Sequence, residues 1–171
     1  MQVARSVGAL TELAAQPVQV DVDGLVGAAV RLVPDLGQQL ALADHLSGAP
    51  YIQEKLGGKI GIGHEVIVIQ ETFGKIFNEG TEFQRDGSQF DQLFEDGDTY
   101  QIGNLKAFTI HTPGHTPACM THVIGDAAFV GDTLFMPDGG SARADFPGGD
   151  AGTLYDSIQK ILALPDAMRL F

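Results

Sequence analysis

The chain has 171 residues, of which 44% are hydrophobic and 19% charged, and this composition indicates one globular domain and excludes a disordered or fibrous protein. Acidic residues outnumber basic ones by 22 to 10, and the formal charge of -12 disfavours polyanionic partners such as nucleic acids and anionic membrane surfaces. The apolar stretches are too short to span a bilayer, so we expect neither a signal peptide nor a transmembrane helix.

Short elements are predicted in the first half of the chain. Residues 18–22 alternate apolar and polar side chains, which is typical of a half-buried strand, and residues 35–46 have the composition of a helix. Ser47 is the expected N-cap of a further helix that reaches Leu56 and ends at the glycine pair 57–58. After this helix we predict a strand over residues 59–63 and turns at Gly74, at Gly80 and at residues 86–87.

The second half predicts a series of strands followed by a helix. Gly-Asn and Gly-Asp pairs mark hairpin turns, so successive strands are expected to pair in an antiparallel or mixed sheet. The expected strands are 99–102, 105–111, 120–124 and 127–130. Residues 150–164 predict the clearest helix, because Leu154 and Ile161 recur at helical spacing and Pro165 ends it. A new apolar run begins at Met168, and we expect that the chain is cut where a strand begins.

The chain contains one cysteine, Cys119. A single cysteine cannot form an internal disulfide or a thiolate metal cage, and this suits a reducing compartment such as the cytoplasm. Its position four residues after His115 fits a small packed residue better than a nucleophile.

Three segments, 43–46, 111–117 and 129–135, carry side chains that zinc, iron or manganese accept as ligands. The candidate ligands are Asp44 and His45 in the first segment, His115 in the second and Asp132 in the third. Each stands at the end of an apolar segment beside Gly or Pro, where a loop can hold it at the rim of a sheet. Taken singly these motifs are weak, because an Asp-His pair is often a cap and Gly-Asp-Thr is often a turn. We interpret the other histidines as partly exposed strand or loop residues, namely His64, His111 and His122.

In this order and spacing, the three segments resemble the metallo-β-lactamase superfamily. Its pattern is His-x-His-x-Asp-His, then Thr-Pro-Gly-His-Thr, then Gly-Asp-Thr and a final His, and the matching segments here are 112–116 and 131–133. The resemblance extends from about Ala43 to Phe171. Segments 80–87, 138–140 and 143–146 are similar to the branch that holds persulfide dioxygenases and β-lactamase-like hydrolases, near glyoxalase II. The resemblance implies a mixed α/β (α+β) protein, an αββα sandwich with a metal site at one edge of its two sheets.

The resemblance also implies roles for individual residues. Asp44 would be catalytic and would bind the second metal together with His45, while His115 would bind the first metal and Asp132 would bridge the two. Arg143 and Asp145 would lie just outside the ligands. One or two zinc or iron ions would activate water or O2 by Lewis acidity, without a protein nucleophile. The implied substrates are a small thiol of the persulfide type, a thioester or a lactam, and the acidic charge argues against the nuclease branch.

The chain departs from the family pattern at the first two ligands and at the last. Leu40 and Leu42 stand where the family has histidines, and the final histidine would fall beyond Phe171. The first metal would keep only His115 and Asp132, whereas catalytic sites normally have three protein ligands. We therefore expect weak metal binding and weak or absent activity. Two alternatives stay open: a non-catalytic remnant or binding module, and an incomplete domain that is stable only as a homo-oligomer.

The first fifty residues differ from the rest in composition. The ten Phe and three Tyr residues all lie from Tyr51 onward, although a share of 8% would place about four in the first fifty positions. We expect an atypical segment over 1–42 and a partial, truncated metallo-β-lactamase-fold domain over 43–171. A frameshift, wrong start or rearrangement would explain the segment, and so would a divergent, metal-poor family member.

Overall fold

Two sheets form the centre of the protein. The computed structural model describes residues 19–21, 48–76 and 84–171. Within this part, three strands form a parallel sheet in the order β1-β2-β3: β1 (Gln19–Asp21), β2 (Lys59–Gly63) and β3 (Gln92–Phe94). Five further strands form a mixed sheet in chain order: β4 (Thr99–Ile102), β5 (Leu105–His111), β6 (Met120–Ile124), β7 (Ala127–Phe129) and β8 (Arg169–Leu170).

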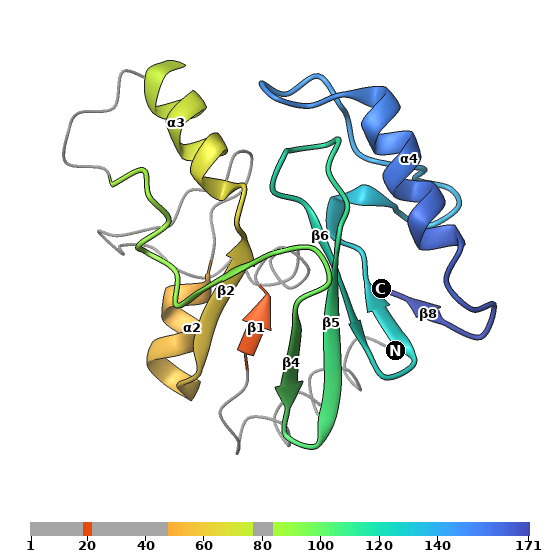
Figure 1. Ribbon diagram of the computed structural model, residues 1–171, viewed down its shortest axis with the longest axis horizontal. Helices are drawn as coiled ribbons and strands as arrows, with labels where there is room; N and C mark the ends of the chain where they lie inside the picture. The colour runs from red at the N-terminus through yellow and green to blue at the C-terminus, as the bar shows by residue number, and fades with distance from the viewer. Residues whose placement is uncertain (1–18, 22–47, 77–83) are drawn as a thin grey trace.

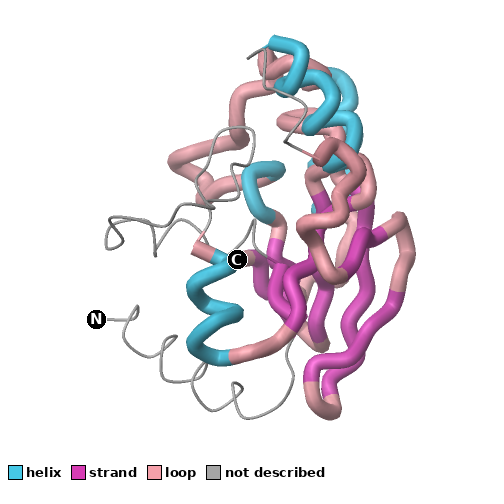
Figure 2. The backbone as a smooth tube through the Cα atoms, turned by 90° about the vertical axis from the view of Figure 1, so that its left-hand side faces the viewer, coloured by secondary structure: helices cyan, strands magenta, loops and turns pink. Residues whose placement is uncertain are grey.

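Helices lie on the outer sides of the two sheets. Figure 1 shows α2 (Ala49–Leu56) and α3 (Val66–Ile76) beside the three-stranded sheet, and α4 (Ala151–Leu162) beside the five-stranded one. The side view in Figure 2 shows the strands gathered together, with helical and loop segments around them. This arrangement confirms the expected mixed αββα architecture. No helix in the described part of the chain has the length and hydropathy of a membrane span.

The strands predicted in the second half are confirmed, together with their turns. β4, β5, β6 and β7 pair antiparallel in succession, and β8 adds to β7 in parallel. Gly103 and Gly125 occupy the two hairpin turns with φ of 57° and 62°, a conformation that favours glycine. The run that begins at Met168 therefore contributes the last of the described strands of this sheet.

Two expectations for the first half are wrong in detail. The N-cap of α2 is Gly48, with no side-chain cap hydrogen bond, and not Ser47. Pro50 in the first turn has no backbone N–H, so one of the two donors that a capping side chain uses is missing. Gly74 is not a turn but a buried position inside α3. Its lack of a side chain makes room for Arg85, whose Nη2 donates to the Gly74 carbonyl at 3.3 Å.

The remaining predictions for the first half divide into two groups. The strands 18–22 and 59–63 are confirmed by β1 and β2, Gly57 ends α2 at a φ of 74°, and 86–87 is a turn with Gly87 at 71°. The helix 35–46 and the turn at Gly80 lie outside the described residues.

The core between the two sheets contains a histidine that the sequence did not place there. Phe94 of β3 contacts Tyr100 of β4 and His122 of β6, with ring centroids 5.1 and 5.3 Å apart. His122 is 1% exposed and its Nδ1 is 2.8 Å from the Tyr100 hydroxyl. The expected partial exposure is therefore wrong for His122, because β6 is an inner strand and is covered on both faces. It is right for His64 and His111, which are half-buried.

The helix predicted over 150–164 is confirmed as α4, and Asp150 is its N-cap. The Asp150 carboxylate accepts hydrogen bonds from the Thr153 amide at 2.7 Å and the Thr153 hydroxyl at 2.8 Å. These bonds favour the ionised carboxylate and lower the pKa of Asp150 below its ordinary value of 3.8.

Removal of this cap should give a pH-dependent loss of stability. A group whose pKa is lower in the folded state stabilises the fold above its unfolded pKa, and this stabilisation is lost as the pH falls through the folded value. In Asp150→Ala, the unfolding midpoint in urea should lie below that of the parent chain at neutral pH, and the difference should shrink below pH 3.8. Urea unfolding at a series of pH values measures this. A difference that stays constant into acid would contradict the ionised cap.

Candidate metal centre

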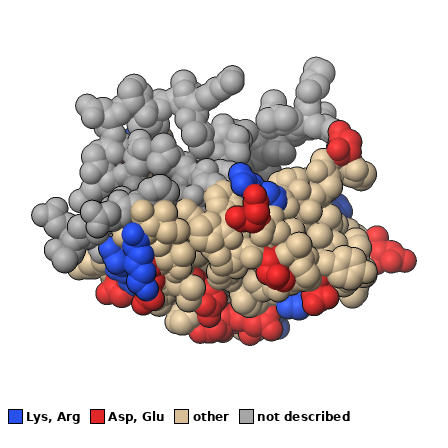
Figure 3. Space-filling model, turned by 90° about the horizontal axis from the view of Figure 1, so that it is seen from above, with Lys and Arg blue, Asp and Glu red and all other residues tan. Residues whose placement is uncertain are grey.

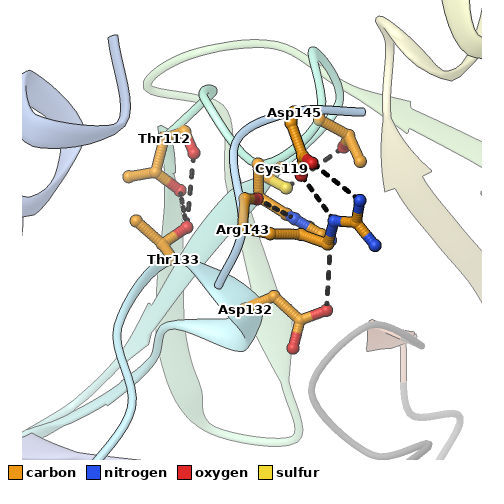
Figure 4. A network of polar contacts seen from close by, with 8 residues as sticks. Thr112, Cys119, Asp132, Thr133, Arg143 and Asp145 are labelled. Carbon is orange, nitrogen blue, oxygen red and sulfur yellow. Dashed lines mark hydrogen bonds and ion pairs between the residues drawn. The ribbon is translucent and has the colours of Figure 1, made fainter. Parts of the chain in front are cut away.

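Two candidate ligands meet at one end of the five-stranded sheet. β5 and β7 both run antiparallel to β6, so the C-terminal ends of β5 and β7 lie at the same end of the sheet. The loop after β5 carries His115, and the short 3-10 helix η2 (Gly131–Thr133) after β7 carries Asp132. His115 Nε2 and Asp132 Oδ2 are 3.5 Å apart, and Figure 4 marks this contact as the dashed line that leaves the labelled Asp132 side chain.

The orientation of the His115 ring is fixed by a backbone carbonyl. His115 is 3% exposed, and its Nδ1 lies 2.7 Å from the carbonyl oxygen of Arg143. A carbonyl only accepts, so Nδ1 carries the proton, and in the neutral ring the lone pair is on Nε2. Nε2 is the atom that faces the Asp132 carboxylate. This is the arrangement of a metal-binding histidine whose other nitrogen is held by a hydrogen bond.

The separation of the two side chains suits a shared cation. Zinc bonds to imidazole nitrogen and carboxylate oxygen are about 2.0–2.2 Å, and tetrahedral geometry places two such ligand atoms about 3.3 Å apart. The observed 3.5 Å between His115 Nε2 and Asp132 Oδ2 is close to this value. The two residues therefore fit two ligand positions of a zinc or iron site.

The rest of the implied ligand set is not brought together within the described residues. No group of three or more His, Cys, Asp or Glu side chains that could hold a metal occurs there. Asp44 and His45 lie outside the described part of the chain, as do Leu40 and Leu42. His115 and Asp132 are thus the part of the implied set whose geometry is defined.

Arg143 and Asp145 lie next to His115, and their side chains form an exposed ion pair. Nε and Nη2 of Arg143 donate to the two carboxylate oxygens of Asp145 at 2.5 and 2.7 Å, and these bonds lower the pKa of Asp145. The guanidinium lies 5.0 Å from the ring centroid of Phe146, whose ring in turn stands edge-on to His115 at 5.2 Å. The pair is well exposed, so its contribution to stability is small. Phe146 is thus the side chain that packs between the Arg143 guanidinium and the His115 ring.

The backbone before His115 is held by donors from two parts of the fold, α4 with its N-cap and η2. Four consecutive carbonyls accept hydrogen bonds: His111 from Lys160 Nζ at 2.9 Å, Thr112 from Thr133 Oγ1 at 3.3 Å, Pro113 from Ser157 Oγ at 2.7 Å and Gly114 from the Asp150 amide at 2.9 Å. Ser157 is 1% exposed, so its hydroxyl is shielded from competing water. The loop therefore has little freedom to move His115.

Gly114 permits the close approach of this loop to α4. Its φ is 135°, and a Cβ at this position would overlap the backbone nitrogen and Cα of Leu154. Both the conformation and the lack of space require glycine. The loop and the first turn of α4 are consequently in direct backbone contact.

Sequence analysis missed three residues that position the site: Phe146, Ser157 and Thr133. Thr133 and Phe146 lie in the motif segments 131–133 and 143–146 but carry no predicted role there, and Ser157 follows Leu154 by three positions on the apolar face of the predicted helix. Cys119 is partly exposed, and its sulfur is 3.1 Å from the hydroxyl of Thr116. On the face shown in Figure 3, acidic side chains occur at several separate places among the described residues, and basic ones lie beside some of them.

Comparison with known proteins defines the family. The model of the metallo-beta-lactamase superfamily matches residues 43–171, and the chain belongs to this superfamily. A protein of Burkholderia pseudomallei named "Probable metallo-hydrolase" is 58% identical over 139 residues, which cover 75% of this chain and 47% of that protein. The mitochondrial persulfide dioxygenase ETHE1 of Bos taurus is 34% identical over 145 residues, which cover 79% of this chain and 49% of that protein.

Solved structures agree with the fold. The crystal structure of ETHE1 from Myxococcus xanthus superposes with a TM-score of 0.61 and 23% identity, covering 99% of this chain and 59% of that one. The chain spans about half the length of the two relatives. The lineage is that of metallo-β-lactamase-fold hydrolases and dioxygenases.

Substitution of Gly114 tests the backbone contact with α4. Gly114→Ala should lower the free energy of unfolding by about 3 kcal/mol or more, because the new methyl group overlaps backbone that cannot rotate away. Gly125→Ala is the matched control, since it also has a positive φ but faces open space, and it should cost only about 1–2 kcal/mol. Chemical denaturation measures both. Equal losses at the two positions would contradict the close contact.

Proposed function

We propose that the chain carries a partly retained metal centre of a metallo-β-lactamase-fold enzyme of the persulfide dioxygenase or thioester/lactam hydrolase type. His115 and Asp132, together with Asp44 and His45, would hold zinc or iron weakly, and turnover would be weak or absent. The observation that carries the proposal is the 3.5 Å approach of His115 Nε2 to Asp132 Oδ2, with Nδ1 held by the Arg143 carbonyl.

The chain's own groups have distinct parts in this proposal. A bound ion would supply Lewis acidity. His115 keeps one tautomer because Nδ1 donates to the Arg143 carbonyl, and Nε2 is thereby left to bind. Asp132 supplies negative charge beside it, and Asp44 takes the catalytic role that the family motif gives to that position. Phe146 excludes water from one side of the His115 ring.

The proposed substrates are small and lie within the class that the relatives' names suggest. One relative is named as a metallo-hydrolase and another as a persulfide dioxygenase. A thioester or a lactam fits the name of the hydrolase and a small thiol of the persulfide type fits that of the dioxygenase, whereas the net charge of -12 opposes a nucleic acid. A cytoplasmic location belongs to the same proposal, on the basis of the single cysteine.

A non-catalytic remnant is the second candidate function. It is favoured by Leu40 and Leu42, which stand where the family motif has ligating histidines. A leucine side chain has no donor atom, so two ligand positions are lost under either candidate. Under this candidate, the fold would persist as a binding module without a functional metal.

Metal analysis separates the two candidates. The full chain is incubated with excess Zn²⁺ or Fe²⁺ and the bound metal is measured by equilibrium dialysis and elemental analysis. We expect close to one equivalent that is removed by a chelator, and His115→Gln and Asp132→Asn should each abolish it. His64→Gln, at a half-buried histidine whose ring faces Glu65 and Glu95, should bind as the parent does. Binding no greater than that of His115→Gln would overturn the metal centre and favour the remnant.

We also propose that the chain forms a homo-oligomer through exposed apolar edges. Among the described strands β8 is the last of its sheet, and Leu170 and Phe171 are 41% and 59% exposed. An open edge with apolar side chains favours pairing with another strand. Size-exclusion chromatography with light scattering should give a mass above one chain, and Phe171→Lys should shift the population toward monomer. A stable parent monomer over a wide concentration range would contradict this.

A further inference from the structure

Three threonine hydroxyls connect the two segments that carry His115 and Asp132. Thr133 Oγ1 lies 3.3 Å from both the carbonyl oxygen and Oγ1 of Thr112, so its single proton is shared between two acceptors. Thr112 Oγ1 is in turn 3.2 Å from Thr121 Oγ1. Figure 4 shows Thr112 and Thr133 facing each other beside Asp132. We call these three residues the threonine cluster.

The threonine cluster is sealed from solvent. Thr112, Thr121 and Thr133 are each 0% exposed. A buried hydroxyl or carbonyl that loses its partner cannot replace it with water, so its hydrogen bond is maintained as the protein fluctuates. A surface hydrogen bond of the same length would exchange freely with solvent.

Thr133 is joined to Asp132 through a short, closed backbone turn. The Thr133 amide donates to the Val130 carbonyl at 3.2 Å and closes η2, and the Asp132 carbonyl accepts from the Ala142 amide at 3.2 Å. A movement of the Thr133 side chain therefore carries Asp132 with it. On the other segment, Thr112 is three residues before His115, and the carbonyls of residues 111–114 all accept hydrogen bonds.

We propose that Thr133 is a positioning residue that sets the separation between His115 and Asp132 through its hydrogen bond to Thr112. The inference rests on the proposed metal centre, because the separation has a function only if the pair binds metal. The hydroxyl, and not the bulk of the side chain, holds the two segments together. A supporting residue of this kind changes metal affinity about 10–100-fold when its hydrogen bond is lost.

Hydrogen exchange in the metal-free full chain is the first test. In Thr133→Val, which keeps the shape and removes the hydroxyl, the amides of Gly114 and Ala142 should exchange about tenfold faster relative to the amides of β5 and β6. Those strands report global unfolding, so a general loss of stability leaves the ratio unchanged. Thr133→Ser retains the hydroxyl and should keep the ratio of the parent.

Thr121→Val is the matched control. It makes the same change in the same cluster at the same burial, but Thr121 lies in β6 and not in a segment with a candidate ligand. Its ratio of local to global exchange should equal that of the parent. Should Thr133→Val fold poorly, Thr112→Val removes one of the two acceptors and should give a smaller rise of the same ratio. An unchanged ratio in Thr133→Val, or an equal rise in Thr121→Val, would overturn the inference.

Cobalt binding is the second test and separates this inference from the proposed function. Titration with Co²⁺, followed by its visible absorption, should show affinity reduced about 10–100-fold in Thr133→Val and by less than about threefold in Thr121→Val. A parent chain that binds no Co²⁺ would overturn the proposed metal centre, while the exchange ratio would still decide whether Thr133 holds the two segments together. Equal affinity in the parent and Thr133→Val would overturn the inference alone.

Discussion

The backbone contact between Gly114 and Leu154 is the constraint on which the rest of the site depends. It brings the first turn of α4 against the loop after β5, and only then can the Asp150 amide and the Ser157 hydroxyl reach the loop carbonyls. A side chain at position 114 would separate the two segments and lengthen each of these bonds. The loop that carries His115 is therefore held in one conformation, and this orients the imidazole ring. A binding site is preorganised when its side chains are held in this way.

The fold could be predicted where local sequence determines local structure. The hairpins around Gly103 and Gly125 and the helix that ends before Pro165 follow from turn chemistry and periodicity, and all three are present. The burial of His122 could not be predicted, since it depends on Phe94 from a different sheet. The helical role of Gly74 could not be predicted either, because it depends on Arg85, a residue outside its own helix. The failures are thus at positions where a distant side chain decides the environment.

The candidate site shows the same division between local pattern and tertiary contact. Spacing within a recognised motif was enough to select His115 and Asp132, and the structure brings these two together. The contacts that orient them could not be derived from spacing, because Thr133 acts on Thr112 across 21 positions and Ser157 acts on Pro113 across 44. Such long-range hydrogen bonds carry no periodic signal. The motif identifies the chemistry, and the tertiary contacts give it a geometry.

The hydrogen bond between His115 and the main chain of residue 143 has a consequence for how this site is studied. The acceptor is a peptide oxygen, so Arg143→Ala or any other exchange of that side chain leaves the contact available. Alanine scanning therefore does not remove the hydrogen bond that fixes the His115 tautomer. Any effect of replacing Arg143 comes from the loss of its guanidinium beside Asp145 and Phe146. Only a change to the peptide bond itself, such as an ester in place of the following amide, would weaken that acceptor.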